Sequence, residues 1–326
     1  MYKANDHRYD NIKIRRAGDS GLQLPAISFG MWHSFGDDAN FQNSEKVMLD
    51  AFDKGIFSFD LANNYGPGSG AAERMFGQVY RKDLKPYRDE LVITTKAGYH
   101  MWPGPYGQFS SRKTLIAALD RSLKRMGLDY VDIYYSHRFD PNTNLEETAK
   151  ALDDIVKSGK ALYIGISNYY GKQTKEIIKY FNEFHTPFVV NQMSYNMLNR
   201  KIENDGTIQA LRDDHDGLVV YGPLAEGLLT DKYLNGVPDD VKLHRSNNDV
   251  LKHGLTNKLN QLNDLAKNRH QTLAQMSIAW LLNNPTVASV VTGASKVKHL
   301  NDNLKALDNT KFSTDELDQI NKILKK

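Results

Sequence analysis

The sequence predicts an α/β protein: a TIM (β/α)8 barrel with an N-terminal β-hairpin and two extra helices. Short apolar runs rich in β-branched residues alternate with longer amphipathic segments, and this alternation repeats eight times. A length of 326 residues fits one such barrel as well as two smaller domains. No Pro-, Gly- or Ser-rich linker divides the chain, so we expect residues 1–326 to form a single barrel domain.

Eight strands and eight helices follow from this pattern, because parallel strands buried on both faces are short and continuously apolar. The predicted strands are residues 26–30, 57–60, 91–96, 131–136, 162–166, 188–192, 218–221 and 287–292. Helical spacing of apolar residues predicts helices at 44–54, 71–79, 111–126, 145–157, 173–184, 207–214, 272–282 and 297–307. Gly55, Gly127 and Gly159 end three of these helices, as glycine commonly does.

Four segments lie outside the repeating units. Residues 12–15 and 22–24 flank Gly18-Asp19-Ser20-Gly21, which predicts a β-hairpin that plugs one end of the barrel. A long connection runs from residue 229 to about 257, and an added helix follows at 258–268. Ser313 precedes a terminal helix at 314–324, where serine is a favoured cap.

Composition excludes several classes of function. The chain has 42 Lys and Arg against 39 Asp and Glu, without a basic run, so we expect no nucleic-acid partner. It has no cysteine, which excludes disulfides and thiolate chemistry. Its ten histidines show no ligand spacing, so we predict no metal site. No apolar run approaches about 18 residues and the amino terminus is too polar for a signal peptide, which indicates a cytoplasmic protein without membrane contact.

The alternative α/β architecture, an open doubly wound sheet, lacks its signature in this chain. Gly66-Pro67-Gly68-Ser69-Gly70 follows the second predicted strand but does not match G-x-G-x-x-G. Pro67 suits a plain turn better than a loop that holds a pyrophosphate. The barrel is therefore the favoured architecture.

The carboxyl ends of barrel strands meet at one mouth, so residues there form the candidate active site. Asp60 ends the second predicted strand, Tyr65 follows it, Lys96 ends the third, and His137 follows the fourth. We expect the Lys96 cation to lower the pKa of Tyr65, Asp60 to keep Lys96 charged, and His137 to hydrogen-bond a substrate oxygen. Such a set suits protonation of an alkoxide as it forms from a carbonyl.

Other interpretations of these residues remain open. Taken singly, an Asp at a strand end is usually a cap, a Lys there is usually solvated, and a Tyr in such a loop usually packs. Lys96 at a barrel-strand end also suits a Schiff-base aldolase, which needs a lysine with a depressed pKa.

The ordered motifs of the chain resemble those of the aldo-keto reductases, NADPH-dependent carbonyl reductases built on a TIM barrel. The resemblance covers nearly the whole chain. Its motifs are residues 29–32 (FGMW), 59–66 (FDLANNYG), 93–96 (ITTK), 136–138 (SHR), 165–169 (GISNY), 191–192 (NQ), 223–225 (PLA), 227–229 (GLL) and 291–295 (VTGAS). Through residues 96–107 it is most similar to the branch of bacterial L-glyceraldehyde 3-phosphate reductases and potassium-channel β subunits.

The resemblance implies a catalytic tetrad of Asp60, Tyr65, Lys96 and His137, with Tyr65 as the general acid. It also implies NADPH as the cofactor, because a cation beside Ser295 suits a 2′-phosphate. The implied cofactor-binding residues are Trp32, Asp60, Ser167, Asn168, Gln192, Tyr221, Pro223, Leu224, Ala225, Gly227, Leu228, Lys232, Gly293, Ser295, Lys296, His299, Asp302 and Asn303. A solvated helix start remains the alternative for Lys296.

The predicted substrate site combines an apolar wall with polar groups that suit a small phosphate or hydroxyl. It comprises Trp32, His33, Tyr65, Tyr99, Met101, Trp102, His137 and Arg138, with His100 beside them. Arg138 either binds a substrate phosphate or supports the barrel rim, and the sequence leaves both possibilities open.

Three functions are compatible with these residues. The first is reduction of small aldehydes such as glyceraldehyde 3-phosphate or methylglyoxal by NADPH. The second is an NADPH-binding, redox-sensing partner subunit with slow turnover, and the third is the Schiff-base aldolase. The resemblance further implies a homo-oligomer, a tetramer or an octamer.

Overall fold

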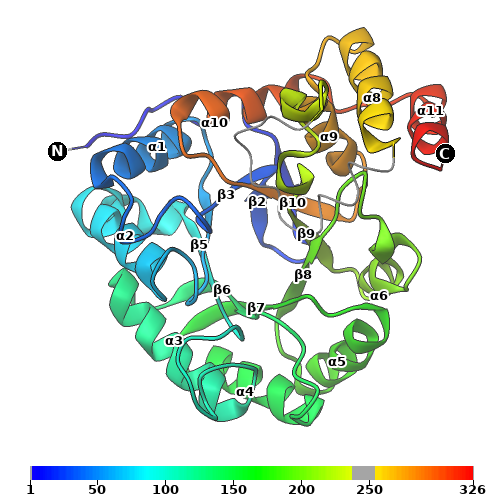
Figure 1. Cartoon of the computed structure of the whole chain (residues 1–326). Helices are drawn as coiled ribbons and strands as arrows, with labels where there is room; N and C mark the ends of the chain where they lie inside the picture. Colours follow the sequence, from blue (N-terminus) through cyan, green and yellow to red (C-terminus); the bar gives the residue numbers. More distant parts are fainter. Residues whose placement is uncertain (1, 237–253, 326) are drawn as a thin grey trace.

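The strands of the computed structural model, which describes residues 2–236 and 254–325, form one closed barrel surrounded by helices (Figure 1). All neighbouring barrel strands are parallel, in the order β10-β3-β4-β5-β6-β7-β8-β9. They are β3 (Ile27–Gly30), β4 (Ser58–Asp60), β5 (Val92–Ala97), β6 (Val131–Ser136), β7 (Ala161–Ser167), β8 (Phe188–Ser194), β9 (Gly217–Tyr221) and β10 (Val287–Thr292). The predicted TIM barrel is confirmed.

The helices follow the strands in the predicted alternation. They are α1 (Phe41–Asp53), α2 (Ala71–Val79), α3 (Arg112–Met126), α4 (Leu145–Lys157), α5 (Gly171–Phe184), α6 (Thr207–Asp213), α9 (Leu273–Leu282) and α10 (Val297–Leu304), with α8 (Thr256–Asn268) and α11 (Thr314–Lys325) as the two extra helices. Most of the predicted connection at 229–257 lies outside the described residues.

Local capping explains where the observed helices differ from the prediction. Helix α1 begins at Phe41, three residues before the predicted start, because the Asn40 side chain accepts a hydrogen bond from the Asn43 amide. After α2 the chain continues through a π-helical turn at Tyr80–Leu84 and a 3₁₀ segment at Lys85–Glu90, which the sequence pattern did not predict.

The predicted hairpin is confirmed as β1 (Ile14–Arg16) paired antiparallel with β2 (Gln23–Pro25). Its turn packs on the loop that precedes β9, where the Asp19 amide donates to the His215 carbonyl at 2.9 Å. Gly18 has a φ of +58°, and a Cβ there would lie 1.9 Å from the same carbonyl oxygen. Only glycine fits at this position, so the turn closes tightly over the amino ends of the strands.

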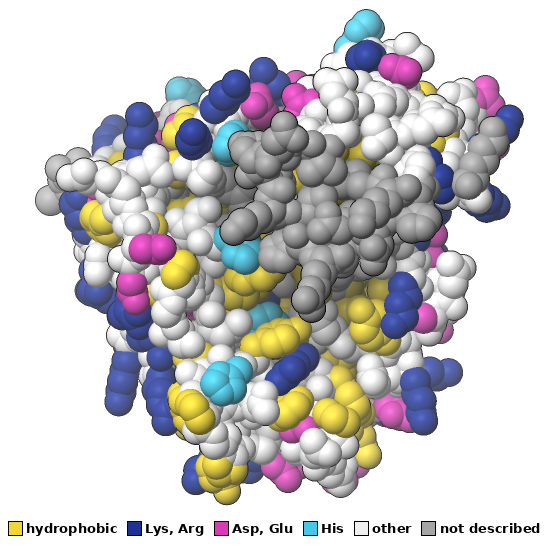
Figure 2. Space-filling view, in the orientation of Figure 1, with side chains coloured by type: hydrophobic (Ala, Val, Ile, Leu, Met, Phe, Trp, Pro, Cys, Tyr) yellow, Lys and Arg dark blue, Asp and Glu magenta, His cyan; other side chains and the backbone are white. Residues whose placement is uncertain are grey.

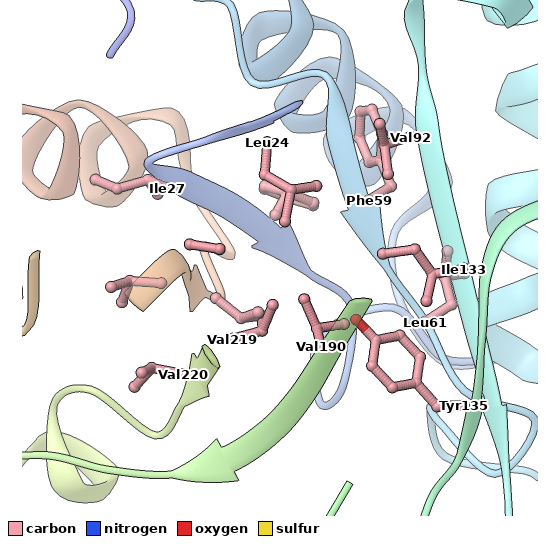
Figure 3. Packing of buried hydrophobic residues seen from close by; sticks show 14 of the residues in the cluster. Leu24, Ile27, Phe59, Leu61, Val92, Ile133, Tyr135, Val190, Val219 and Val220 are labelled. Atoms are coloured by element: carbon pink, nitrogen blue, oxygen red, sulfur yellow. The ribbon is translucent and has the colours of Figure 1, made fainter. Parts of the chain in front are cut away.

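The barrel interior is filled by side chains rather than open (Figure 3). Leu24 of the hairpin lies in this cluster with Phe59, Ile133, Val190 and Val219 from four barrel strands. All five side chains are nearly inaccessible to water. A ligand therefore cannot bind inside the barrel.

Asp216, which precedes β9, provides a test of stability. Burial, and then the charge of Asp214 and a hydrogen bond with it, raise the pKa of Asp216 to about 9. Because the unfolded carboxyl ionises near about 3.9, this residue destabilises the fold increasingly as pH rises from about 4 to about 9. Asp216→Asn should therefore raise the free energy of unfolding at pH 8 by about 1–3 kcal/mol.

Thermal unfolding of the Asp216→Asn variant at pH 8 and at pH 4 measures this effect. The gain in Tm should be close to zero at pH 4, because the wild-type carboxyl is protonated in the folded state and about half protonated in the unfolded chain. Asp213→Asn, on an exposed neighbour, is the control. A gain of equal size at both pH values would contradict the assignment.

Among the described residues, no helix is long and apolar enough to cross a membrane.

Candidate active site

The four predicted catalytic residues lie at the ends of three adjacent strands. Asp60 ends β4, Lys96 lies near the end of β5, and His137 directly follows β6, while Tyr65 lies in the loop after β4. The register pairs Asp60 with Thr94 and Lys96 with Tyr135, so Lys96 lies two residues beyond the level of Asp60, and His137 lies two residues beyond the level of Lys96. The fold thus brings all four into one cluster.

The Lys96 ammonium is at the centre of this cluster. Its Nζ donates to Asp60 Oδ2 at 2.6 Å, to the Leu61 carbonyl at 2.7 Å and to the Tyr65 hydroxyl at 3.4 Å. The Lys96 side chain is completely inaccessible to water. All three ammonium protons are therefore engaged inside the protein, and the nitrogen cannot reach a substrate carbonyl as an aldolase nucleophile would.

Asp60 is held from three sides. Its Oδ1 accepts hydrogen bonds from Thr94 Oγ1 at 2.9 Å and from Gln192 Nε2 at 2.8 Å, while Oδ2 binds Lys96. A carboxylate with this many donors is fixed in place and needs no rearrangement when the charge nearby changes.

The pKa of Tyr65 differs in direction from the sequence expectation. Burial of the hydroxyl, followed by the negative charge of Asp60, raises the pKa of Tyr65 well above its ordinary value. The lowering expected from Lys96 does not set the direction, because burial and the Asp60 charge outweigh the long 3.4 Å hydrogen bond from the Lys96 ammonium. The corrected conclusion is that Tyr65 keeps its proton at neutral pH.

His137 is an uncharged group in this structure. Burial, and then the positive charges of Lys96 and Arg138, lower the pKa of His137 well below its ordinary value. Its ring lies between Tyr65, at a centroid distance of 5.6 Å, and Tyr99, at 4.6 Å. Within the described residues its buried Nδ1 has no hydrogen-bond partner. A neutral imidazole beside Tyr65 suits hydrogen bonding to a substrate oxygen.

The lysine in this cluster also has a shifted pKa. Burial lowers the pKa of Lys96 below its ordinary value, and the adjacent Asp60 carboxylate opposes that shift. The depressed pKa is the one property that an aldolase lysine needs, but the three hydrogen bonds and complete burial argue against that role.

A cavity of about 1020 Å³ opens beside Tyr65 and reaches α10. Figure 2 shows hydrophobic and histidine side chains gathered near the middle of the visible face, over the barrel strands of Figure 1. The predicted residues that line the cavity are Trp32, His33, Asp60, Tyr65, Tyr221, Pro223, Leu224, Ala225, Gly227, Leu228, Gly293, Ser295, His299 and Asn303. This volume lies at the upper end of the about 300–1,000 Å³ usual for ligand sites, so the cavity can hold a large ligand.

Sequence reasoning missed a second group of residues that line this cavity. They are Gly30, Met31, Ser34, Phe35, Ser194, Asn196, Leu198, Asn199, Gly222, Glu226, Val291, Thr292 and Ala294. Asn196 organises part of this wall, because its Nδ2 donates to the Gly222 carbonyl at 2.9 Å and its Oδ1 accepts from two backbone amides. Asparagine commonly forms turns, so an asparagine shortly after β8 was the sequence signal that could have indicated this wall of the cavity.

Three predicted nicotinamide-binding residues bond to one another or to the catalytic cluster, and they do not line the cavity. Ser167 Oγ donates to the Gln192 carbonyl at 2.9 Å, and Gln192 Nε2 donates to Asp60. Asn168 donates to the His137 carbonyl at 3.0 Å and accepts from the Tyr221 hydroxyl at 2.8 Å. Its φ of +58° is uncommon for a residue other than glycine and turns the side chain back under this network.

Three further predicted cofactor residues, Lys296, Asp302 and Lys232, also lie outside the cavity lining. Lys296 caps α10 without a side-chain hydrogen bond and is exposed, so the first amides of the helix lack a side-chain partner. Lys296 and Asp302 lie beside the cavity lining rather than in it. Lys232 is exposed and its Nζ lies 5.6 Å from the Tyr233 ring.

The predicted substrate wall is only partly assembled around the cavity. Trp32 is 51% exposed, and its ring centroid lies 3.6 Å from that of His33. The Tyr99 ring contacts His137. Trp102 instead lies against the Arg121 guanidinium of α3, 4.5 Å from its ring centroid. Tyr99, Met101, Trp102, His137 and Arg138 do not line the cavity, although His137 and Tyr99 border its Tyr65 end.

No group of three or more metal-ligating side chains occurs within residues 2–236 and 254–325.

Comparisons with known proteins agree with this geometry. The model of the aldo/keto reductase family matches residues 26–325. The chain is 50% identical to the L-glyceraldehyde 3-phosphate reductases of Escherichia coli K12 and of Escherichia coli O157:H7, over 98% of this chain and 94% of each relative. It is also 35% identical to a probable voltage-gated potassium channel subunit beta of Arabidopsis thaliana, over 91% of this chain and 92% of that relative.

Proposed function

The chain belongs to the aldo/keto reductase family, and from this premise we propose that it is an NADPH-dependent reductase of small aldehydes of the glyceraldehyde 3-phosphate or methylglyoxal type. The observation that carries the proposal is the position of the Tyr65 hydroxyl, which lies 3.4 Å from Nζ of Lys96, a lysine in a buried ion pair with Asp60, while Tyr65 lines a large cavity. Residues 1–326 act as one domain in this proposal.

Each of the four catalytic residues has its own role in the proposed reduction. When bound, NADPH supplies the hydride. Tyr65 gives its proton to the oxygen that becomes the alcohol, acting as a general acid. Lys96 stabilises the phenolate that remains, and Asp60 balances the charge of Lys96. Neutral His137 donates a hydrogen bond to the same substrate oxygen and holds the carbonyl beside Tyr65.

The cavity fits an extended dinucleotide because its lining runs from Asp60 and Tyr65 to Ser295, His299 and Asn303. Tyr221 would stack on the nicotinamide, and residues 223–228 would follow the pyrophosphate with mostly backbone groups. Lys296 and the amino terminus of α10 would hold a 2′-phosphate, since helix amino termini attract anions. Ser167, Asn168 and Gln192 would exchange part of their internal hydrogen bonds for the carboxamide.

The lining also bears on the substrate. Among the described residues that line the cavity there is no Lys or Arg, and His33 and His299 are the groups able to carry positive charge. The described lining is compatible with a small neutral aldehyde as well as with a phosphorylated one. The similarity to L-glyceraldehyde 3-phosphate reductases supports the phosphorylated substrate, so both belong in the test.

A binding titration followed by an activity screen tests this function. We expect NADPH to quench tryptophan fluorescence at concentrations at least tenfold below NADH, and Lys296→Gln to reduce this preference because it removes a cation from the phosphate site. We expect L-glyceraldehyde 3-phosphate and methylglyoxal to consume NADPH. Equal affinity for both cofactors would contradict the cofactor assignment, and no consumption with any small aldehyde would contradict the reductase.

A redox-sensing partner subunit is the second candidate, favoured by the similarity to channel β subunits. It predicts tight NADPH binding with very slow turnover, whereas a reductase should approach the median enzyme rate of about 10 per second. Single-turnover and steady-state rates on the best aldehyde distinguish the two. From the same resemblance we propose that the protein is a cytoplasmic homo-oligomer of four or eight subunits.

A further inference from the structure

The loop between β5 and α3, residues 98–110, forms one side of the site and includes Tyr99, whose ring contacts His137. Its two ends meet at the base, where the Phe109 amide donates to the Gly98 carbonyl at 2.8 Å. Phe109 has a φ of +67°, a conformation that costs free energy in a residue with a side chain. Other contacts must offset this cost and keep the two ends of the loop together.

The Arg138 guanidinium holds both ends of the loop. Its Nε donates to the Gly98 carbonyl at 3.0 Å, and its Nη2 donates to Gln108 Oε1 at 2.9 Å. The same planar group lies 4.7 Å from the Tyr99 ring centroid and 4.2 Å from that of Phe109. One side chain therefore contacts the first two positions of the loop and also positions 108 and 109 near its end.

The backbone of Arg138 adds a further connection. Its carbonyl accepts a hydrogen bond from Ser110 Oγ at 3.1 Å. A Cβ at Gly98 would lie 3.2 Å from His137 Cβ and 3.3 Å from the Arg138 amide, so the loop begins in close contact with this strand end. The position of the loop is thus coupled to the position of His137.

We propose that Arg138 is a positioning residue that clamps the loop at 98–110 and so holds Tyr99 against His137 at the aldehyde site. The proposal rests on the reductase function proposed above. It differs from phosphate recognition by Arg138, because Nε and Nη2, which form the fork that grips an anion, are already bonded within the protein. The clamp should therefore matter equally for charged and neutral aldehydes.

The variant Arg138→Met tests the clamp, because methionine keeps the length of the side chain but has no hydrogen-bond donor. We expect KM for methylglyoxal and for L-glyceraldehyde 3-phosphate to rise at least tenfold and by similar factors. kcat should change less than threefold and the NADPH dissociation constant less than twofold. Arg121→Met is the matched control, because Arg121 stacks on Trp102 of the same loop without touching its base, and its KM should stay unchanged.

Limited proteolysis gives a readout that does not depend on activity. Chymotrypsin cleaves after aromatic residues that no proline follows, and in the loop these are Tyr99, Tyr106 and Phe109. We expect cleavage within residues 98–110 to become at least tenfold faster in Arg138→Met, while Arg121→Met cleaves like the wild type. Arg138→Lys keeps the charge but cannot bond both Gly98 and Gln108 in one plane, so it should give an intermediate rate.

Several outcomes would overturn the clamp. One is a rise in KM confined to the phosphorylated aldehyde, which would restore phosphate recognition; another is unchanged cleavage of the loop. If Arg138→Met does not fold, Gln108→Ala removes a single bond and must still accelerate cleavage there. If the wild type reduces no aldehyde, the reductase function fails, while the proteolysis still decides the clamp.

Discussion

Tyr65→Phe is expected to lower kcat for aldehyde reduction by about 10²–10⁴-fold, the usual contribution of a positioned general acid. The variant removes one oxygen atom, whose hydrogen bond to Lys96 is long at 3.4 Å. Packing around the ring is unchanged, so the NADPH dissociation constant and Tm should remain near their wild-type values. Stopped-flow hydride transfer with NADPH and the best aldehyde measures the effect.

The matched control for this variant is Tyr134→Phe, a fully buried tyrosine outside the site. Its hydroxyl donates to the Leu115 carbonyl at 2.8 Å, so its loss should lower Tm and leave kcat unchanged. Aldehyde reduction by Tyr65→Phe at the wild-type rate would show that another group supplies the proton.

The raised pKa of Tyr65 also fixes the direction of the pH dependence. A general acid works only in its protonated form, so reduction should lose this donor as pH rises through the raised pKa, above the ordinary value near about 10. Between about pH 6 and pH 9 the ionisation of Tyr65 should therefore leave the rate of reduction unchanged. A loss of rate centred near pH 7 that disappears in Tyr65→Phe would contradict a raised pKa.

Lys96→Met is expected to destabilise the fold and to reduce activity together. The substitution leaves Asp60, whose side chain is only 6% exposed, without its partner, and an unpaired buried charge costs about 3–5 kcal/mol. It also removes the cation that stabilises the Tyr65 phenolate. Thermal unfolding should show a lower Tm, and kcat should fall at least as far as in Tyr65→Phe.

A double variant separates the two effects of Lys96. Lys96→Met with Asp60→Asn removes both charges, so it should recover a large part of the lost Tm. It should not recover kcat, because the cation beside Tyr65 is still missing. Equal destabilisation in the single and the double variant would mean that the ion pair contributes little to the fold.

The sequence alone predicted the barrel and the order of its elements, because each strand and helix is encoded by a local apolar period. It also predicted that Asp60, Tyr65, Lys96 and His137 converge, since the ends of parallel strands in a barrel share one mouth. The roles of these residues in catalysis and cofactor binding stay predictions. The family followed from ordered motifs and is confirmed by the match over residues 26–325.

Other properties arise only when distant residues meet. The direction of the Tyr65 pKa depends first on the burial of its hydroxyl and then on the Asp60 carboxylate, which Gln192 holds from 132 positions away, and no local pattern encodes either. The sequence left open whether Arg138 binds a substrate phosphate or supports the barrel rim, and in the folded loop its guanidinium contacts the rings of Tyr99 and Phe109. Sequence periodicity determined which strand, helix or loop each residue belongs to. Tertiary packing decided the direction of its side chain and the charge around it, because both depend on residues that are distant in the sequence.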